Sequence, residues 1–501
     1  MRRYYLALAV IMIVLMLCGC AANPDKDAVV SKNNGSFDAG VIQSATAPAQ
    51  PQEVYISESF TSTDGSVEFS LNLDQTLIPP AVPVVEVVPH YLTGEDAKRV
   101  CQVLFGENAV FYEKEPTMAP LEQMFTRAEA MEALQRWAKY TNLDALRELY
   151  GKHLDTSVQD VQWSIEELTE AYEKIPEKFK HREAEWTIKS DAYYHKTAEQ
   201  IEAESIDPKE DNDAIRVMTN VDGILYGVNF VTRNRSDYKL NQVYAELTDL
   251  FSPAWLDVDI MEAELTRTEE PTEEQVEAVA EKAQKLLDEV ELGQWKVDQC
   301  YTIIDDRAEK LSYTIYVTAV PLIEGVPAIR RPQLYNLKSD NAYASNYYLT
   351  DAMLVFSAEG KLIDFTMYSP IDVKEVLNDN VATMTMDELV QRAKEHLSLS
   401  DMEAYGLEGE LLDVLERGAG EDFYCKIELC EMEYGMFRVK VPNTDESYYY
   451  VPGAMFYATI DYCGNESGEI YASSGTDFGD GRVIPLLALN AVDGSVITLT
   501  N

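Results

Sequence analysis

The sequence predicts an α+β fold in which antiparallel sheets are each crossed by helices. Apolar runs with alternating polarity flank acid-glycine pairs, as they do in antiparallel hairpins. Capping boxes precede stretches whose apolar residues recur at helical spacing. One order of elements also occurs twice in the C-terminal half. We therefore expect two tandem helix-on-sheet modules there, and a helical segment in the N-terminal half.

Residues 53–256 are expected to form an N-terminal α+β domain. Its first hairpin turns at Asp64-Gly65, between "VYISESF" and "SVEFSLNL". A helix begins after Thr93 and ends at Gly106, because a cap residue precedes it and glycine stops it. The other elements expected in this domain are a mostly helical stretch over 121–182, a hairpin at Asp222-Gly223 and a short helix over 238–251.

The first copy of the repeated order defines module 1, residues 257–370. A capping box at Thr272 opens a helix with an acidic outer face, and Gly293 ends it. Two strands follow, then Val326-Pro327. The copy closes with a hairpin in "LVFSAEGKLIDF" that turns at an acid-glycine pair.

The second copy defines module 2, residues 371–501. A capping box at Thr385 opens its helix, and paired strands with a tight turn at Gly435 follow. Val451-Pro452 comes next. The copy closes with "LALNAVDGSVITL", a hairpin that turns at Asp493-Gly494. Each copy is expected to be a curved antiparallel sheet with one helix across a face.

The N-terminus has the pattern of an export signal. Arg2-Arg3 precedes an apolar run from Tyr4 to Leu17, which is short for a bilayer span and has the size of a signal peptide. The run ends in Leu17-Cys18-Gly19-Cys20, which resembles the bacterial lipobox. An ordinary signal peptide that ends in cysteine is the alternative interpretation.

The lipobox resemblance implies that residues 1–19 are a lipoprotein signal peptide, cleaved after Gly19, and that the thiol of Cys20 receives a diacylglyceryl group. Residues 20–52 would then be the lipidated cysteine and a flexible tether, because they are polar, rich in small residues and without periodicity. Lipid on Cys20 is expected to be the only membrane anchor of the chain.

Composition excludes some partners. The formal net charge is −46, so the chain is not expected to bind nucleic acid through phosphate contacts. An anionic membrane surface should also repel it, which suits a tethered body that faces outward. Five cysteines follow Cys20, and their odd number and irregular spacing do not indicate a disulfide framework. We interpret them as buried apolar residues, with a pairing of Cys463 left open.

No catalytic residue, cofactor site or metal site is predicted. The histidines are scattered without metal-ligand spacing, at His90, His153, His181, His195 and His396. A Ser-x-x-Lys at 236–239 and a Ser-Asp-Asn at 339–341 occur in penicillin-binding proteins and β-lactamases, but the third element, Lys-Thr/Ser-Gly, is missing. Ser236 is instead expected to cap the helix over 238–251.

Tyrosines cluster at three places, namely 193–194, 347–348 and 448–450. Adjacent strand residues face opposite sides, so one tyrosine of each cluster can be buried while another is exposed. Exposed tyrosines suit contacts with proteins or glycans. A plain β-preference of tyrosine explains the clusters equally simply.

Longer stretches of the sequence resemble known protein families. "YYYVPGAMFYA" and the final strand with Asn490 to Ser495 resemble extracytoplasmic modules of the PepSY type and the YycH/YycI type, over residues 270–500. The lipobox, "DGSVEFSLNLDQTLIPP", "VVPHYLTGEDAKRV" and "LFGENAVFYE" resemble Gram-positive lipoproteins of domain-of-unknown-function family 6034. The module resemblance implies binding or inhibition by a sheet or groove, without a cofactor.

We therefore expect an extracytoplasmic lipoprotein, anchored by lipid to the outer face of the cell membrane. Its expected function is non-catalytic, as a binding or regulatory module of the cell envelope, with an envelope protein as partner and no nucleic acid. A solute- or glycan-binding lipoprotein is the first alternative. A surface hydrolase of unrecognised type is the second.

Overall fold

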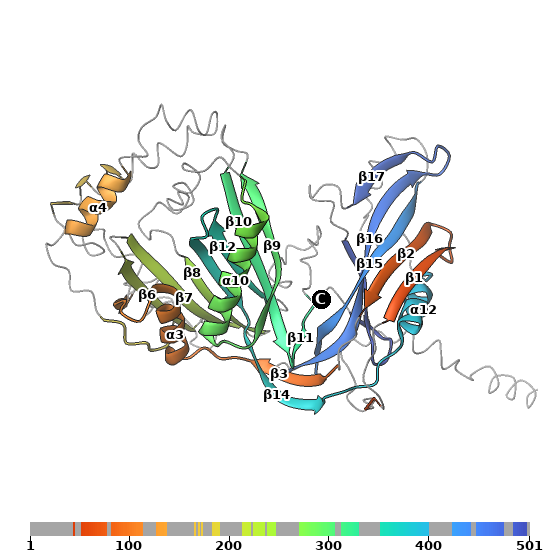
Figure 1. Ribbon diagram of the computed structural model, residues 1–501, viewed down its shortest axis with the longest axis horizontal. Coiled ribbons are helices and arrows are strands. Elements are labelled where there is room, and N and C mark those ends of the chain that lie inside the picture. The colour runs from red at the N-terminus through yellow and green to blue at the C-terminus, as the bar shows by residue number, and fades with distance from the viewer. Residues whose placement is uncertain are drawn as a thin grey trace, which may run out of the picture. The chain divides into compact units, whose positions relative to one another are not determined.

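Strands dominate the fold in the computed structural model (Figure 1). The structure describes residues 44–45, 52–77, 82–113, 127–137, 165–166, 169–170, 172–173, 183–190, 213–221, 224–235, 238–246, 270–305, 312–329, 351–399, 423–441, 447–474 and 484–497. Within them, strands β1 to β19 far outnumber the helices, which are short. The prediction of an α+β fold with helix-crossed sheets is therefore wrong, and the fold is sheet-dominated.

The chain divides into two compact units. Unit 1 comprises residues 1–86, 331–337 and 374–501, and unit 2 comprises 87–330 and 338–373. Each unit thus combines segments that lie far apart in the sequence.

A nine-stranded sheet contains the strands of unit 1. Its main path runs β1-β2-β15-β16-β18-β19, with β17 against β16. β2 pairs with β15 in parallel, from Val67 opposite Cys425 to Leu71 opposite Leu429. The strands of this path and its branch are β1 (Gln52–Thr61), β2 (Val67–Leu77), β15 (Phe423–Lys440), β16 (Tyr448–Gly464), β17 (Ile470–Ser474), β18 (Ile484–Asn490) and β19 (Val496–Ile497). β3 (Val84–Pro89) and β14 (Ile371–Asn378), which pair with each other, complete the nine, and the sequence boundaries of the units fall within these two strands.

Helix α12 (Met386–Leu397) covers one face of the sheet in unit 1. Thr385 and Glu388 form the predicted capping box, and each accepts a hydrogen bond from the backbone of the other. Leu389, Ala393 and Leu397 are buried, because their spacing places them on one side of the helix. They pack in one core with inward residues of β2, β15, β16 and β18.

A ten-stranded sheet forms unit 2. Its main path runs β11-β10-β12-β13-β8-β7-β6-β4, with β9 against β10 and β5 against β6. Its strands are β4 (Phe111–Glu113), β5 (Lys189–Ser190), β6 (Asp213–Val221), β7 (Ile224–Arg235), β8 (Tyr238–Glu246), β9 (Trp295–Asp305), β10 (Ser312–Ile323), β11 (Val326–Pro327), β12 (Asp351–Ser357) and β13 (Leu362–Tyr368). Helices α3 (Gly94–Phe105), α4 (Arg127–Trp137) and α10 (Glu273–Val290) belong to the same unit.

Helices α10 and α3 supply the helical part of the unit 2 core. A capping box at Thr272 starts α10, as predicted. Val279, Ala283 and Leu287 are buried, and they cluster with inward residues of the sheet and of α3. Figure 1 shows α10 lying along β9 and β10.

The order of elements predicted to repeat occurs once in each unit. A capped helix precedes four strands that pair in chain order, β9-β10-β12-β13 after α10 and β15-β16-β18-β19 after α12. Neither set is a separate sheet, because β8 pairs with β13 and β2 pairs with β15. Strands from the N-terminal half therefore cover edges that tandem modules would leave open.

Two local predictions are wrong. The short helix expected over 238–251 is replaced by strand β8, which pairs with both β7 and β13. The tight turn expected at Gly435 is also absent, since β15 continues through this residue and pairs Gly435 with Gly453. In both places pairing with neighbouring strands outweighs the local signal.

The predicted acid-glycine turns within the described residues are confirmed. Gly65, Gly360 and Gly494 have φ values of 81°, 78° and 71°, which glycine adopts without a steric cost. They join β1 to β2, β12 to β13 and β18 to β19. β6 and β7 pair as predicted around Asp222-Gly223, which itself lies outside the described residues.

Gln284 of α10 is bonded to the backbone of strand β9. Its amide nitrogen donates to the carbonyl oxygen of Trp295 at 2.9 Å, and its amide oxygen accepts from the N–H of Val297 at 2.9 Å. β9 pairs only with β10 among the described strands, so it is an edge of the sheet. The side chain of Gln284 thus takes the place of a neighbouring strand at these two backbone groups.

Replacing Gln284 with alanine should lower the free energy of unfolding of unit 2 by about 1–3 kcal/mol, because it leaves the two backbone groups of β9 without this partner. Urea unfolding followed by tryptophan fluorescence measures the effect, since all five tryptophans of the chain fall in unit 2. Glu281→Ala is the control, because the side chain of Glu281 is exposed on the same helix. A Gln284→Ala protein as stable as the wild type would contradict the interpretation.

Candidate functional site

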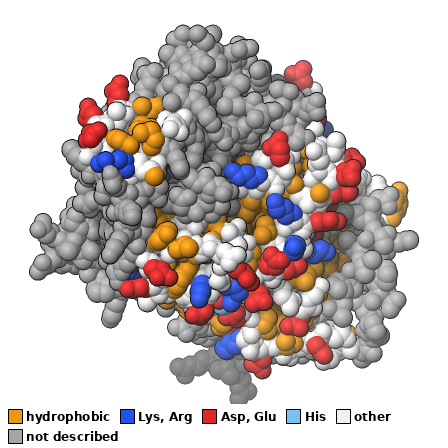
Figure 2. All heavy atoms as spheres, turned by 60° about the vertical axis from the view of Figure 1, so that its left-hand side comes forward, with side chains coloured by type: hydrophobic (Ala, Val, Ile, Leu, Met, Phe, Trp, Pro, Cys, Tyr) orange, Lys and Arg blue, Asp and Glu red, His pale blue; other side chains and the backbone are white. Residues whose placement is uncertain are grey.

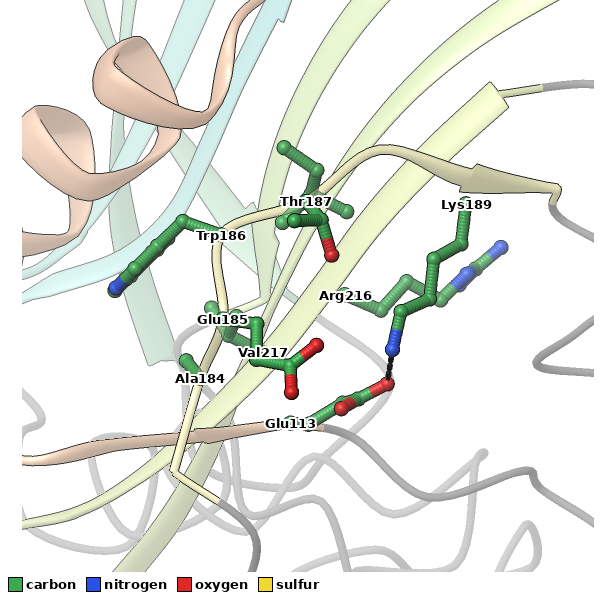
Figure 3. Close-up of a pocket in the computed structure, with 9 residues that line it drawn as sticks. Glu113, Ala184, Glu185, Trp186, Thr187, Lys189, Arg216 and Val217 are labelled. Carbon is green, nitrogen blue, oxygen red and sulfur yellow. Dashed lines mark hydrogen bonds and ion pairs between the residues drawn. The ribbon is translucent and has the colours of Figure 1, made fainter.

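A buried ion pair lies where two short strands meet along β6. β4 and β5 both pair with β6, Glu113 opposite Val217 and Lys189 opposite Ala214. This register brings the end of β4 to the start of β5. The amine of Lys189 donates to the Oε1 carboxylate oxygen of Glu113, and Figure 3 shows the two side chains directed at each other.

Both charged groups are largely removed from water. The side chain of Glu113 is 7% exposed and that of Lys189 is 18% exposed. Burial lowers the pKa of the Lys189 amine, because a buried ammonium loses its hydration. The carboxylate offsets this loss, so the two charges stabilise each other in the folded state.

The ion pair lies in a small pocket. Glu185, Trp186, Thr187 and Arg216 complete most of its wall, and the indole of Trp186 points away from the ion pair (Figure 3). Arg216 donates to the side-chain oxygen of Asn229 on β7 at 2.9 Å. The pocket therefore combines two acids and two bases within a wall that is otherwise partly apolar.

Contacts of both its backbone and its ring fix the position of Trp186. Its φ is 54°, in the left-handed region that a bulky residue rarely adopts. A Cβ on Gly94 would lie 2.0 Å from the carbonyl oxygen of Trp186, so only glycine at the start of α3 admits this segment. The indole also meets the ring of Phe111 edge-on, with the centroids 5.5 Å apart.

The chemistry of this pocket is that of a structural ion pair. A lysine of lowered pKa beside a carboxylate also occurs in proton-transfer sites. Here the amine of Lys189 is already engaged by Glu113, and this bond fastens β5 to β4. We therefore assign the pair to the stability of unit 2.

A second polar cluster surrounds His90, just before α3. Its Nδ1 is 3.0 Å from both carboxylate oxygens of Asp372, and its Nε2 is 3.2 Å from Oδ2 of Asp96. Arg99 donates to Asp96 at 2.6 Å and to the carbonyl oxygen of Val290 at 2.9 Å. The cluster thus ties the first turn of α3 to the C-terminus of α10 and to the start of β14.

Asp96 is the centre of this cluster. Burial opposes its ionisation, but the hydroxyl and N–H of Thr93, at 2.6 Å and 2.9 Å, and the ring of His90 outweigh burial. Together they hold the pKa of Asp96 below its ordinary value. Asp96 therefore acts both as a capping-box residue and as the anion of the cluster.

Asp96→Asn should lower the free energy of unfolding at pH 7 by about 1–3 kcal/mol, because charge-assisted hydrogen bonds are lost. The pKa of Asp96 is lower in the folded state than in the unfolded state, so its contribution is present above the unfolded value of 3.8 and is lost as the pH falls through the folded value. The difference from wild type should thus shrink below about pH 4.

Urea unfolding of both proteins at neutral and acidic pH, followed by tryptophan fluorescence, measures this loss. Glu95→Gln is the control, since Glu95 is exposed on the same turn of α3. Equal stability of Asp96→Asn and wild type at pH 7 would refute the role given to the cluster.

The structure brings few of the residues considered in the sequence into these clusters. His90 enters the second cluster, and His396 is half-buried on α12, where burial lowers its pKa. Lys239 lies in strand β8, which takes the place of the helix that Ser236 was expected to cap. Positions outside the described residues are Cys20, His153, His181, His195, Ser236, 193–194, 339–341 and 347–348.

The third tyrosine cluster and the cysteines are described. Tyr450 is buried and Tyr448 and Tyr449 are half-buried in β16. The guanidinium of Arg438 lies 3.6 Å from the ring centroid of Tyr448. The five cysteines that follow Cys20 all have free thiols, and Cys101, Cys425 and Cys463 are buried.

Sequence reasoning missed both polar clusters. Asp372 is far from His90 in the chain, and Glu113 is far from Lys189, so no local spacing relates them. The capping-box pattern at Thr93 was the one available signal, because it marks Asp96 as a bonded carboxylate.

The described residues contain no group of three or more His, Cys, Asp or Glu side chains arranged to hold a metal ion. None of their helices has both the length and the apolar character of a membrane span. On the face seen in Figure 2, acidic, basic and apolar side chains are interspersed.

The sequence matches no protein-family model and no curated protein. Among solved structures, it is similar to an uncharacterised protein from Eubacterium rectale, with 10% identity, a TM-score of 0.36, and 89% of this chain and 93% of that chain covered. It is also similar to the YpeB C-terminal domain of Bacillus megaterium, with 10% identity, a TM-score of 0.22, and 54% and 85% covered. With both TM-scores below 0.5, these similarities define neither the fold nor the function of this chain.

Proposed function

We propose that this protein is a lipid-anchored extracytoplasmic binding or regulatory protein of the cell envelope, without catalytic activity. The observation that carries the proposal is the apolar run from Tyr4 to Leu17 that ends at Cys20 in a lipobox-like sequence. Lipid on Cys20 would hold the chain at the outer face of the membrane, and residues 21–52 would serve as the tether.

The sheet of unit 1 supports a binding role because one of its faces is polar. Phe69 and Ile427 point into the core under α12, while the alternate residues Asn72 and Glu428 are exposed. The amide of Asn72 donates to the carboxylate of Glu428 at 2.7 Å across β2 and β15. A polar sheet surface whose side chains are fixed by hydrogen bonds suits recognition of another protein.

The resemblance of "YYYVPGAMFYA" to PepSY-type modules belongs to the same proposal. This stretch is the first part of β16, which lies between β15 and β18 in the sheet of unit 1. We propose a PepSY-like role in binding or inhibition for this sheet, with an envelope protein as the partner.

Metabolic labelling with an alkyne-tagged fatty acid, followed by membrane fractionation, tests the anchor in a Gram-positive host. The wild-type chain should carry the label and sediment with membranes, whereas Cys20→Ala should carry none. Cys18→Ala is the matched control, because the lipobox tolerates small residues at that position and the variant should be labelled normally. Equal labelling of Cys20→Ala and wild type would overturn the proposal.

A further inference from the structure

Strand β1 is a regular edge of the sheet in unit 1. Among the described strands it pairs only with β2, and the register runs without a shift from Gln52 opposite Leu77 to Thr61 opposite Glu68. A long regular edge presents a row of backbone donors and acceptors on which another extended chain can pair.

The register shows which backbone groups face this edge. The N–H of Ser62 donates to the carbonyl oxygen of Val67 at 2.9 Å, so position 62 is a hydrogen-bonded position of the hairpin. Such positions alternate along an antiparallel pair, which directs the backbone groups of Glu58 toward β2. The N–H and C=O groups of Ser57 and Ser59 consequently point away from β2.

The inner face of β1 is anchored. Phe60 stacks on Phe69 with the ring centroids 4.7 Å apart, and Glu58 forms an ion pair with Lys394 of α12. The outer face is open, since Tyr55 is 77% exposed and Ser57 and Ser59 are exposed. The edge is therefore pre-organised, and a partner would not have to order it on binding.

The edge strand of unit 2, β9, differs from β1 because its outward backbone groups are partly covered. Gln284 bonds to two backbone groups of β9, and a β-bulge at Asp298 interrupts the pairing of β9 with β10. Bulges and covering groups are devices that block pairing with another chain. β1 has no register shift, and no side chain bonded to its outward backbone groups is seen in the described part of unit 1.

Charge indicates what kind of chain the β1 edge would accept. The hairpin over 52–77 contains five acidic residues and no basic residue. The whole chain has a formal charge of −46, so a second copy would be repelled. A basic segment would be attracted to the hairpin, most strongly at low salt.

We propose that the outer edge of β1 binds an extended, basic segment of a partner protein, which adds to the sheet of unit 1 as a further strand. The proposal rests on the proposed binding role and specifies its partner class. Pairing of the backbones would supply affinity, and alternating basic side chains would supply selectivity.

A fluorescently labelled peptide of alternating lysine and valine is the probe, and fluorescence anisotropy with the full chain measures its binding. Ser57→Pro removes one outward N–H and places a ring in the path of the partner, while the bonds to β2 are kept. Ser57→Ala is the matched control, because it loses the same hydroxyl but keeps the N–H. Ser59→Pro is a second blocking variant for use if Ser57→Pro does not fold.

The peptide should bind wild type and Ser57→Ala alike, and each proline variant that keeps the wild-type unfolding midpoint should bind at least about tenfold more weakly. A folded proline variant that binds like wild type would overturn the edge as the site. Equal binding of a glutamate-valine peptide would overturn the basic partner, and self-association through β1 would replace it with a second copy. Labelling of Cys20 is measured separately, so failure of the anchor and failure of the edge are distinguishable.

Discussion

Gly453→Ala should destabilise the sheet of unit 1 by about 3 kcal/mol or more. A Cβ at this position would lie 2.6 Å from the carbonyl oxygen of Leu489 and 2.6 Å from the ring of Phe437. Both neighbours are fixed, because Leu489 belongs to the adjacent strand β18 and Phe437 is 1% exposed. The strands must therefore separate to admit one methyl group.

Thermal and urea unfolding followed by far-ultraviolet circular dichroism measure this loss, since unit 1 contains no tryptophan. Gly65→Ala is the control. A Cβ on Gly65 would meet no atom within 4 Å, but its φ of 81° is unfavourable for alanine, so we expect a cost of only about 1–2 kcal/mol. Equal costs at the two positions would show that close packing at Gly453 is unimportant.

Lys189→Met should destabilise unit 2 by about 3 kcal/mol, because it removes the cation that faces the buried carboxylate of Glu113. The double variant Glu113→Gln with Lys189→Met should regain most of this loss, since the carboxylate that Lys189 neutralised is then removed as well. Such a recovery is the expected signature of a buried ion pair, in which isolation of one charge costs more than absence of both.

Urea unfolding followed by tryptophan fluorescence measures these changes, because Trp186 lines the same pocket. Lys285→Met is the control, since Lys285 and Glu289 form an exposed pair at 3.7 Å on α10. That change should cost less than about 1 kcal/mol. A double variant no more stable than Lys189→Met would contradict the ion-pair interpretation.

The sequence predicted those features that depend on neighbouring residues. Helices begin after Thr93, Thr272 and Thr385 as expected, because each capping box is complete within four residues. The turns at Gly65 and Gly494 are equally local, since a positive φ requires only the right residue at one position.

Features that depend on distant strands were not predictable in this way. β8 carries residues that are compatible with a helix, but β7 and β13 flank it on both sides and make it a strand. The fold class failed for the same reason, because no local pattern relates β2 to β15. The pairs Glu113–Lys189 and His90–Asp372 likewise exist only after the sheets have assembled.

The parallel pairing of β2 with β15 has a consequence for folding during synthesis. Residues of β2 leave the ribosome early, whereas their partners in β15 lie in the last fifth of the chain, with Val67 opposite Cys425. Closing the long loop between β2 and β15 is slow, and strands that have not yet paired aggregate readily. The segments of unit 2 are complete once residue 373 has emerged, but the sheet of unit 1 must wait for β15. Unit 1 should thus be the last part of the chain to mature and the part most dependent on chaperones.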